Sequence, residues 1–409
     1  MSQRVVVTGM AGLTAFGDNW SDIQSKLKQG ENAVRYMPEW ERFTDMHTKL
    51  AAPIDDYELP TYPRKKIRSM GRVSLLATRA TELALSQAGL LDDSLIKDGR
   101  MGVSYGSSIG STAPIMHFGD MLKNGNSKKI TSTTYIQMMS HTTPVNLGVF
   151  FGLKGRVITS SSACTSGSQG IGYAYEAIKS GAQQLMIAGG AEELCPSEAV
   201  VFDTLFATST QNQNPKSAPR PFEENRDGLV IGEGAGTLIL ESLEHAQARG
   251  AVIYAELVGF GTNSDGTHVT QPQSSTMQVA MEMALNDAGV TGEQIGYVSA
   301  HGTATDKGDV AESLATYQAL KRAVPISSIK SYLGHTLGAC GALEAWFSIE
   351  MMNSGWFAPT LNLDDVDPEC AALDYIVGSG RDIKTDLVMS NNFAFGGINT
   401  SLIFKRWTR

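Results

Sequence analysis

The chain contains few cysteines: four among 409 residues, at positions 164, 195, 340 and 370. No two of them have the C-x-x-C spacing that is typical of zinc sites and redox motifs. Four scattered thiols in a chain of this length also do not form the dense pattern of a disulfide framework. We therefore expect no metal cofactor, no disulfide framework and a reducing compartment.

Long apolar runs and positive charge are also scarce. No apolar run reaches the roughly 18 residues of a membrane-spanning helix, and the N-terminus lacks the charged-then-apolar pattern of a signal peptide. We expect a cytoplasmic protein with no membrane partner. Lysine and arginine number 33 against 42 aspartate and glutamate, a formal net charge of −9. Nucleic-acid binding needs a basic field, so this balance argues against a nucleic-acid partner.

The remaining composition is that of a folded protein, with 18% charged and 42% hydrophobic residues. Strand-like runs alternate with helical patterns, which predicts an α/β fold with buried sheets. The same rhythm restarts after Gly250, so we expect two successive α/β halves, 1–250 and 251–409. The expected strands are 4–9, 101–105, 184–188, 253–258, 295–300, 325–328, 387–390 and 400–405; the expected helices are 20–29, 75–89, 170–180, 277–288, 310–320 and 339–352.

Cys164 lies where a β-branched run, 157–159, gives way to small residues at 165–167. This pattern predicts a strand, a sharp turn and a helix start, with the sulfur near the helix N-terminus. Backbone N–H groups and the helix dipole at such a position favour the thiolate, the nucleophilic form of cysteine. A single buried cysteine is more often inert packing, so the thiol needs partners before it indicates catalysis.

Two histidines supply those partners. His301 and His335 each follow a short β-branched stretch and stand beside glycine, whereas the other five histidines lack this setting. One histidine at a strand end is usually a hydrogen-bonded structural residue. A thiol with two such histidines makes nucleophilic acyl transfer the most economical interpretation.

Five motifs follow one another along essentially the whole chain. They are Ala163-Cys164-Thr165-Ser166-Gly167; Arg220-Pro221-Phe222 with Gly232-Glu233-Gly234; His301-Gly302-Thr303; Lys330 with Gly334-His335; and Asn391-Asn392-Phe393-Ala394-Phe395-Gly396-Gly397. Together they resemble the elongating β-ketoacyl-acyl-carrier-protein synthases. Five motifs in the right order are far more specific than any one of them alone.

The resemblance implies a thiolase-like αβαβα layered sandwich built from two similar α/β halves. Cys164 would take the acyl chain from a thioester on its carrier, and the backbone N–H groups of Cys164 and Phe395 would hold the oxyanion. His301 and His335 would stabilise the enolate that malonyl thioester leaves on losing carbon dioxide, and this enolate would lengthen the chain by two carbons. Phe395 would gate the pocket and Phe393 would line it.

The resemblance also assigns supporting residues. Lys330 would hold the local charge network with Glu312 as its partner, and Asp309 belongs to the same histidine motif. Ile109 would line an acyl tunnel across a dimer interface, although packing of its loop explains this residue equally well. No cofactor is required, since the substrates are carried on the phosphopantetheine of an acyl carrier protein.

Two further suggestions concern ions and charge. Glu344 and Asn391 are weak candidates for a structural cation site. A basic run at 64–68 with a lysine pair further on would dock the acidic carrier protein, although the run is also compatible with a solvated helix end. The residues of this docking surface are Arg64, Lys65, Arg68, Lys128 and Lys129.

Several alternatives stay open. Residues 304–307 depart from the family pattern, and the chain mixes features of both elongating types, which favours a specialised ketosynthase of aryl polyene or polyketide synthesis as an alternative to fatty-acid elongation. A non-decarboxylating thiolase would need a second catalytic cysteine, and Cys340 is better explained by close packing. We expect a homodimer, with a heterodimer as the alternative.

Overall fold

A single large sheet organises the chain. In residues 2–55 and 57–408, which the computed structural model describes, eleven strands form this sheet in the order β13-β11-β10-β15-β16-β9-β1-β8-β6-β4-β5. The first half supplies β1 (Val5–Leu13), β4 (Met101–Gly106), β5 (Val157–Thr159), β6 (Leu185–Glu192) and β8 (Gly234–Ser242). The second half supplies β9 (Ala255–Ser264), β10 (Tyr297–Ser299), β11 (Pro325–Ser327), β13 (Asp374–Tyr375), β15 (Leu387–Ala394) and β16 (Ile398–Arg406).

The two halves repeat one strand order. The first half runs β5-β4-β6-β8-β1 and the second runs β11-β10-β15-β16-β9. In each, the first three strands are parallel and the next two pairings are antiparallel. Strands β1 and β9 pair antiparallel and join the halves, with Val5 opposite Leu257.

Helices cover both faces of this sheet. The first half contains α1 (Trp20–Lys28), α2 (Arg64–Ile67), α3 (Arg72–Gln87), α4 (Thr112–Asn124), α5 (Ser132–Met138), α6 (Thr142–Phe151), α7 (Ser166–Lys179), α8 (Pro196–Asp203) and α9 (Leu243–Ala248). The second half contains α10 (Ser274–Ala288), α11 (Asp306–Leu320), α12 (Lys330–Leu333) and α13 (Cys340–Ser354). Shorter strands lie outside the large sheet: β2 (Arg35–Tyr36), β3 (Leu50–Ala52) and β7 (Ile231–Gly232) pair together, as do β12 (Trp356–Phe357) and β14 (Arg381–Asp382).

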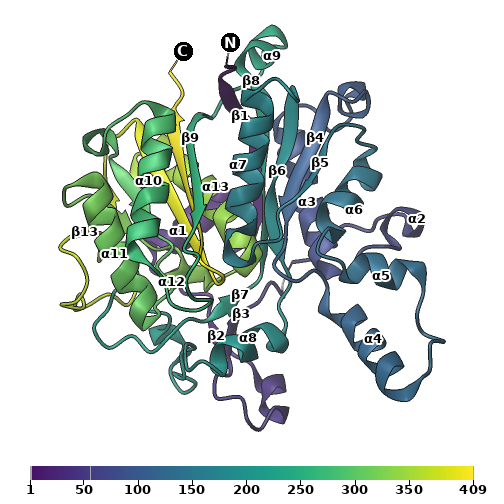
Figure 1. The fold of residues 1–409 in the computed structure, drawn as a ribbon, viewed down its shortest axis with the longest axis horizontal. Helices are drawn as coiled ribbons and strands as arrows, with labels where there is room; N and C mark the ends of the chain where they lie inside the picture. Colours follow the sequence, from purple (N-terminus) through teal and green to yellow (C-terminus); the bar gives the residue numbers. More distant parts are fainter. Residues whose placement is uncertain (1, 56, 409) are drawn as a thin grey trace.

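Helices α7 and α13 form the central layer of the fold, between the strands of the first half and the strands of the second half. Helix α7 contacts β4 and β6 of the first half and β9 and β16 of the second, while α13 contacts β6, β8, β15 and β16. Figure 1 shows α7 between the two groups of strands, with α10 and α11 on one flank and α3 and α6 on the other. The layered α/β sandwich expected from the sequence is therefore confirmed.

Burial explains the sequence of the central helices. Helix α13 is buried on nearly every side, including Trp346 and Phe347, so its residues lack the polar face of a surface helix. Glycines then let the central elements approach closely. A Cβ on Gly190 of β6 would lie 2.2 Å from the Gly338 carbonyl oxygen and 2.8 Å from the Gly167 Cα. No side chain fits at this crossing.

The sequence patterns missed some elements. Strand β8 begins in a glycine-rich segment that resembles a loop, yet its antiparallel neighbours β1 and β6 hold it in the sheet centre. Helices α4 and α5 were also missed; they have little buried surface and protrude at the lower right of Figure 1. Among the described residues, no helix combines the length and apolar character needed to cross a membrane.

The glycine contacts give a stability prediction. We expect Gly190→Ala to destabilise the protein by about 2 kcal/mol or more, because the added methyl meets backbone atoms that cannot turn away. Gly119→Ala is the matched control, since nothing lies within 4 Å of the added methyl on exposed α4. We expect the control to stabilise by about 0.5 kcal/mol. Chemical denaturation of both variants measures this, and equal stability of the two would contradict the close crossing.

Candidate active site

Cys164 has the predicted surroundings: β5 ends at Thr159, a short 3-10 turn spans Ala163–Thr165, and α7 begins at Ser166. Its thiol is buried, and this burial raises the pKa to about 12. Lys330 and the backbone N–H groups of Cys164 and Phe395 act in the opposite direction without cancelling the rise. The sequence-based expectation of a stabilised thiolate is therefore wrong for the resting site, because loss of hydration outweighs the helix N-terminus.

His335 lies directly against this thiol. Its Nε2 is 2.9 Å from the Cys164 Sγ. The backbone around it is fixed, since the His335 N–H donates to the Val230 carbonyl at 2.7 Å and its carbonyl accepts from Gly232 at 2.9 Å. Burial, aided by Lys330, holds the pKa of the imidazole well below its usual value. A neutral imidazole therefore faces a protonated thiol, which can pass its proton to Nε2.

His301 approaches from the end of β10. Its Nδ1 lies 3.2 Å from the Lys330 Nζ and 3.5 Å from the Asn392 Nδ2. Both neighbours are donors, so Nδ1 accepts and the proton is on Nε2. Burial, together with Lys330 and His335, holds the pKa of His301 well below its usual value. The Cys164 sulfur and one nitrogen from each imidazole lie within 4.8 Å of one another.

Lys330 pairs with Glu344, not with Glu312 as expected. Its ammonium contacts one Glu344 carboxylate oxygen, and the Asn392 amide donates to the other at 2.6 Å. Burial alone would lower the pKa of Lys330, but Glu344, Cys340 and Glu312 together outweigh it and the pKa is raised, so the amine stays charged. Both side-chain atoms of Asn391 are buried, with no hydrogen-bond partner among the described residues. The cation site at Glu344 and Asn391 stays a prediction.

Glu312 and Asp309 shape the histidine loop. Glu312 accepts the backbone N–H groups of His301 at 2.7 Å and Gly302 at 2.6 Å, and burial raises its pKa to about 8. Asp309 accepts from the Thr303 N–H at 3.0 Å, and burial raises its pKa to about 6. These carboxylates act on the backbone that presents His301.

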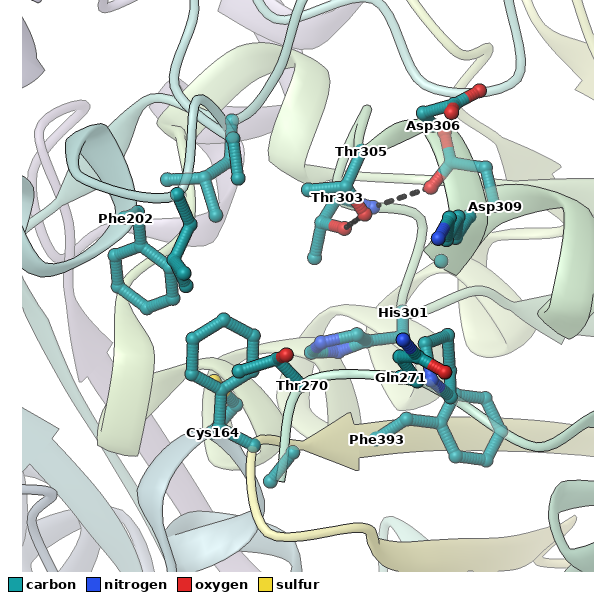
Figure 2. Close-up of a pocket in the computed structure, with 18 of the residues that line it drawn as sticks. Cys164, Phe202, Thr270, Gln271, His301, Thr303, Thr305, Asp306, Asp309 and Phe393 are labelled. Atoms are coloured by element: carbon teal, nitrogen blue, oxygen red, sulfur yellow. Dashed lines mark hydrogen bonds between the residues drawn. The ribbon is translucent and has the colours of Figure 1, made fainter. Parts of the chain in front are cut away.

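Cys164, His301 and His335 line a pocket with a volume of about 460 Å³. Figure 2 shows Phe202 and Thr305 on opposite sides of this space, with Cys164, His301 and Phe393 below them. The Phe393 ring lies 6.1 Å from the His301 ring. The Phe395 ring lies 5.0 Å from the Phe202 ring. Both phenylalanines of the motif at 391–397 therefore lie at the pocket.

The other predicted residues lie outside this cluster. Ile109 is 38% exposed and does not line the pocket. The basic side chains Arg64, Lys65 and Arg68 are exposed on or beside α2, and Lys128 and Lys129 are exposed between α4 and α5. Figure 1 places α2, α4 and α5 on the same side of the molecule.

Sequence reasoning missed three polar residues of the site. Asn392 contacts Glu344, and the Thr303 and Thr305 hydroxyl oxygens lie 2.9 Å apart at the pocket wall. One available signal was Glu344 itself. A carboxylate buried among the apolar residues of α13 needs a buried cation and a hydrogen-bond donor, and these are Lys330 and Asn392.

Comparisons with known proteins agree with this geometry. The N-terminal domain model of the β-ketoacyl synthases matches residues 2–246, and the C-terminal domain model matches residues 254–364. A 3-oxoacyl-[acyl-carrier-protein] synthase 2 of Vibrio cholerae is 39% identical over 99% of both chains.

Solved structures extend the likeness. A β-ketoacyl synthase from Burkholderia phymatum has 61% identity and a TM-score of 0.98, covering 99% of this chain and 100% of the other. A type II polyketide ketosynthase in complex with its acyl carrier protein has 30% identity and a TM-score of 0.88, with 100% of both chains covered. The chain has the thiolase-like fold of these proteins, and it belongs to the β-ketoacyl synthase family of condensing acyltransferases.

Proposed function

We propose that the protein is a β-ketoacyl-acyl-carrier-protein synthase that joins an acyl chain to a two-carbon unit from malonyl carrier. The contact between the Cys164 Sγ and the His335 Nε2, 2.9 Å, carries the proposal. A buried, protonated thiol beside a neutral imidazole is an acid–base pair for acyl transfer. Cys164, His301 and His335 are the proposed catalytic residues, and Lys330 holds His301 in position.

Acyl transfer comes first in this mechanism. The thiol passes its proton to the His335 Nε2 as the sulfur attacks the thioester carbonyl. The backbone N–H groups of Cys164 and Phe395 approach the sulfur and are placed to donate to the oxyanion. The carrier sulfur then leaves with the proton, so that one thioester is exchanged for another.

Condensation follows when malonyl carrier enters the same pocket. Its carboxylate leaves as carbon dioxide and the electron pair forms an enolate. The Nε2–H of His301 is available for the enolate oxygen, because Lys330 and Asn392 occupy the other ring nitrogen. The enolate carbon attacks the acyl-cysteine carbonyl, the carbon–sulfur bond breaks, and the Cys164 thiolate takes up a proton from solvent. Release of carbon dioxide distinguishes this reaction from that of a thiolase.

The substrate class follows the named relatives. Fatty-acid elongation is the first candidate, because the Vibrio cholerae relative is named as a 3-oxoacyl synthase. A specialised polyketide or aryl polyene pathway is the second, supported by the likeness to a polyketide ketosynthase.

The division of the chain near residue 250 and a cytoplasmic location stay predictions; the repeated strand order supports the division. We infer no resident cofactor, since the proposed steps use this chain's own groups.

An acyl carrier protein is the proposed partner. The basic surface of Arg64, Lys65, Arg68, Lys128 and Lys129 is exposed, and acidic partners are steered by such surfaces. The solved polyketide ketosynthase is bound to its carrier, which supports a carrier surface in this family.

The proposed assembly is a homodimer through β5. This strand is at the end of the sheet, so one of its edges has no partner within the described residues, and Val157 on it is 51% exposed. Helix α6, which contacts β5, exposes Val149 at 69%, and the protruding α4 exposes Met116 at 66%. A second copy would continue the sheet and cover these apolar side chains. Ile109 would then line a tunnel shared by the two chains.

The two half-reactions test the proposed function. We expect intact-mass spectrometry to detect an acyl adduct on the natural protein, discharged by malonyl carrier into a product two carbons longer. Cys164→Ser should form no adduct with any acyl carrier, saturated or unsaturated. His301→Gln should keep the adduct but slow carbon dioxide release by about 100-fold, since one enolate donor is lost.

The control for this experiment is Cys195→Ser, because Cys195 lies outside the pocket and should keep the full adduct. An adduct on Cys164→Ser would refute the nucleophile assignment. Discharge by acetyl thioester without carbon dioxide would instead identify a thiolase. Turnover of only aryl or polyunsaturated chains would select the specialised pathway.

The carrier surface gives a prediction of its own. Replacing Arg64, Lys65 and Arg68 with alanine should raise the KM for malonyl carrier about tenfold at low salt, and much less at high salt where charges are screened. The matched control removes three exposed lysines elsewhere, Lys97, Lys384 and Lys405. Equal KM values in both triple variants would remove α2 from carrier docking.

The assembly is measured by sedimentation. We expect a mass of twice 43.8 kDa for the natural chain. Val157→Asp should shift the population toward the monomer, because two carboxylates would face each other across the paired edge. A natural chain that stays at 43.8 kDa, and pairs only with a different ketosynthase-like chain, would favour the heterodimer.

A further inference from the structure

Phe206 occupies a backbone position that usually belongs to glycine. It follows α8, where the Ala207 N–H donates to the Phe202 carbonyl at 3.0 Å and the Phe206 N–H donates to the Asp203 carbonyl at 2.9 Å. This pair of bonds is the Schellman motif, and its penultimate residue is left-handed. Phe206 has a φ of 53°, a conformation that a bulky residue adopts only against steric resistance.

Nothing in the described part of the chain offsets this strain by burial. The Phe206 side chain is 83% exposed, and its nearest aromatic neighbour, His47, is tilted at a centroid distance of 6.1 Å. Other left-handed residues differ: Ala163 and Leu337 are held in turns next to Cys164 and His335. A strained and exposed aromatic residue is typical of a contact made when a ligand is present.

The position of Phe206 in the pocket indicates which part of a thioester substrate the ring would contact. Leu205, Phe206 and Ala207 line the same pocket as Cys164. Cys164 is 4% exposed, so it lies at the inner part of the pocket, whereas Phe206 lies at the mouth. Val269, another lining residue, is 67% exposed. These exposed apolar side chains lie at the part of the pocket that faces solvent, where a thioester from an external carrier enters.

We propose that Phe206 is a substrate-positioning residue that packs against the gem-dimethyl segment of the pantetheine arm. The proposal rests on the proposed function. The arm's thioester end must lie at Cys164, so the segment at the mouth is the one far from the sulfur. That segment carries the arm's branched apolar carbon, which matches the exposed ring of Phe206 and the side chain of Val269. The contacts of the gem-dimethyl group with the Phe206 ring and with the Val269 side chain are both apolar, so they involve no charged group.

Three forms of one acyl donor test this assignment. The donor is presented on the carrier protein, on free pantetheine, and on N-acetylcysteamine, which retains the thioester end of the arm but lacks the gem-dimethyl segment. For Phe206→Gly we expect the KM for the carrier and pantetheine forms to rise about tenfold, with kcat within a factor of two. The N-acetylcysteamine form should show no change in KM. Thermal stability should stay equal or rise, since glycine relieves the left-handed strain.

The matched control is Lys321→Gly. Lys321 is also left-handed, with a φ of 56°, and it ends α11 outside the pocket. It should show the same relief of strain with unchanged KM for all three donors. A loss confined to the carrier form would overturn the proposal in favour of a protein contact, and an equal loss for all three donors, or none, would remove Phe206 from arm binding. Failure of the natural protein to turn over any donor would instead refute the proposed function.

Discussion

The close crossing of the central elements determines where every reactive group lies. Gly167 on α7, Gly190 on β6 and Gly338 before α13 lack the side chains that would separate them. Helix α7 begins at Ser166, close to Cys164, and α13 begins at Cys340, one short turn after His335, so the crossing brings a residue of each half into one pocket. The repeated strand order has the same consequence, since equivalent helices of the two halves meet back to back.

Burial sets the protonation states once the groups have met. Loss of hydration keeps the Cys164 thiol protonated and both imidazoles neutral. Lys330 is the exception, because Glu344 compensates its charge. Its ammonium then selects the His301 tautomer, which leaves Nε2–H free for substrate. The buried ion pair thus holds the neutral imidazole that we propose as catalytic, which is a use of charge that does not depend on net stabilisation.

Two expectations differ from the structure, one about the protonation of Cys164 and one about the partner of Lys330. The sequence around Cys164 places the thiol at a helix N-terminus, and from this we expected a thiolate. The layers packed around the thiol remove its hydration and raise its pKa, and these layers come from other parts of the chain. The family resemblance paired Lys330 with Glu312, whereas Glu344 of α13 lies against Lys330 in the structure. Glu312 is used by the backbone of His301 and Gly302. The carboxylate against the Lys330 ammonium is therefore set by how α13 packs, and not by the motif that contains Glu312.

The sequence by itself determined the alternation of strands and helices, the restart of this rhythm after Gly250, and the types of reactive group. These features depend on residue type and short-range spacing, which a chain displays directly. Tertiary structure alone decided the Lys330–Glu344 pair, the role of Asn392, the protonation of Cys164 and the exposure of Phe206. Each of these depends on which distant segments exclude water from a side chain, and that follows only from how the layers pack.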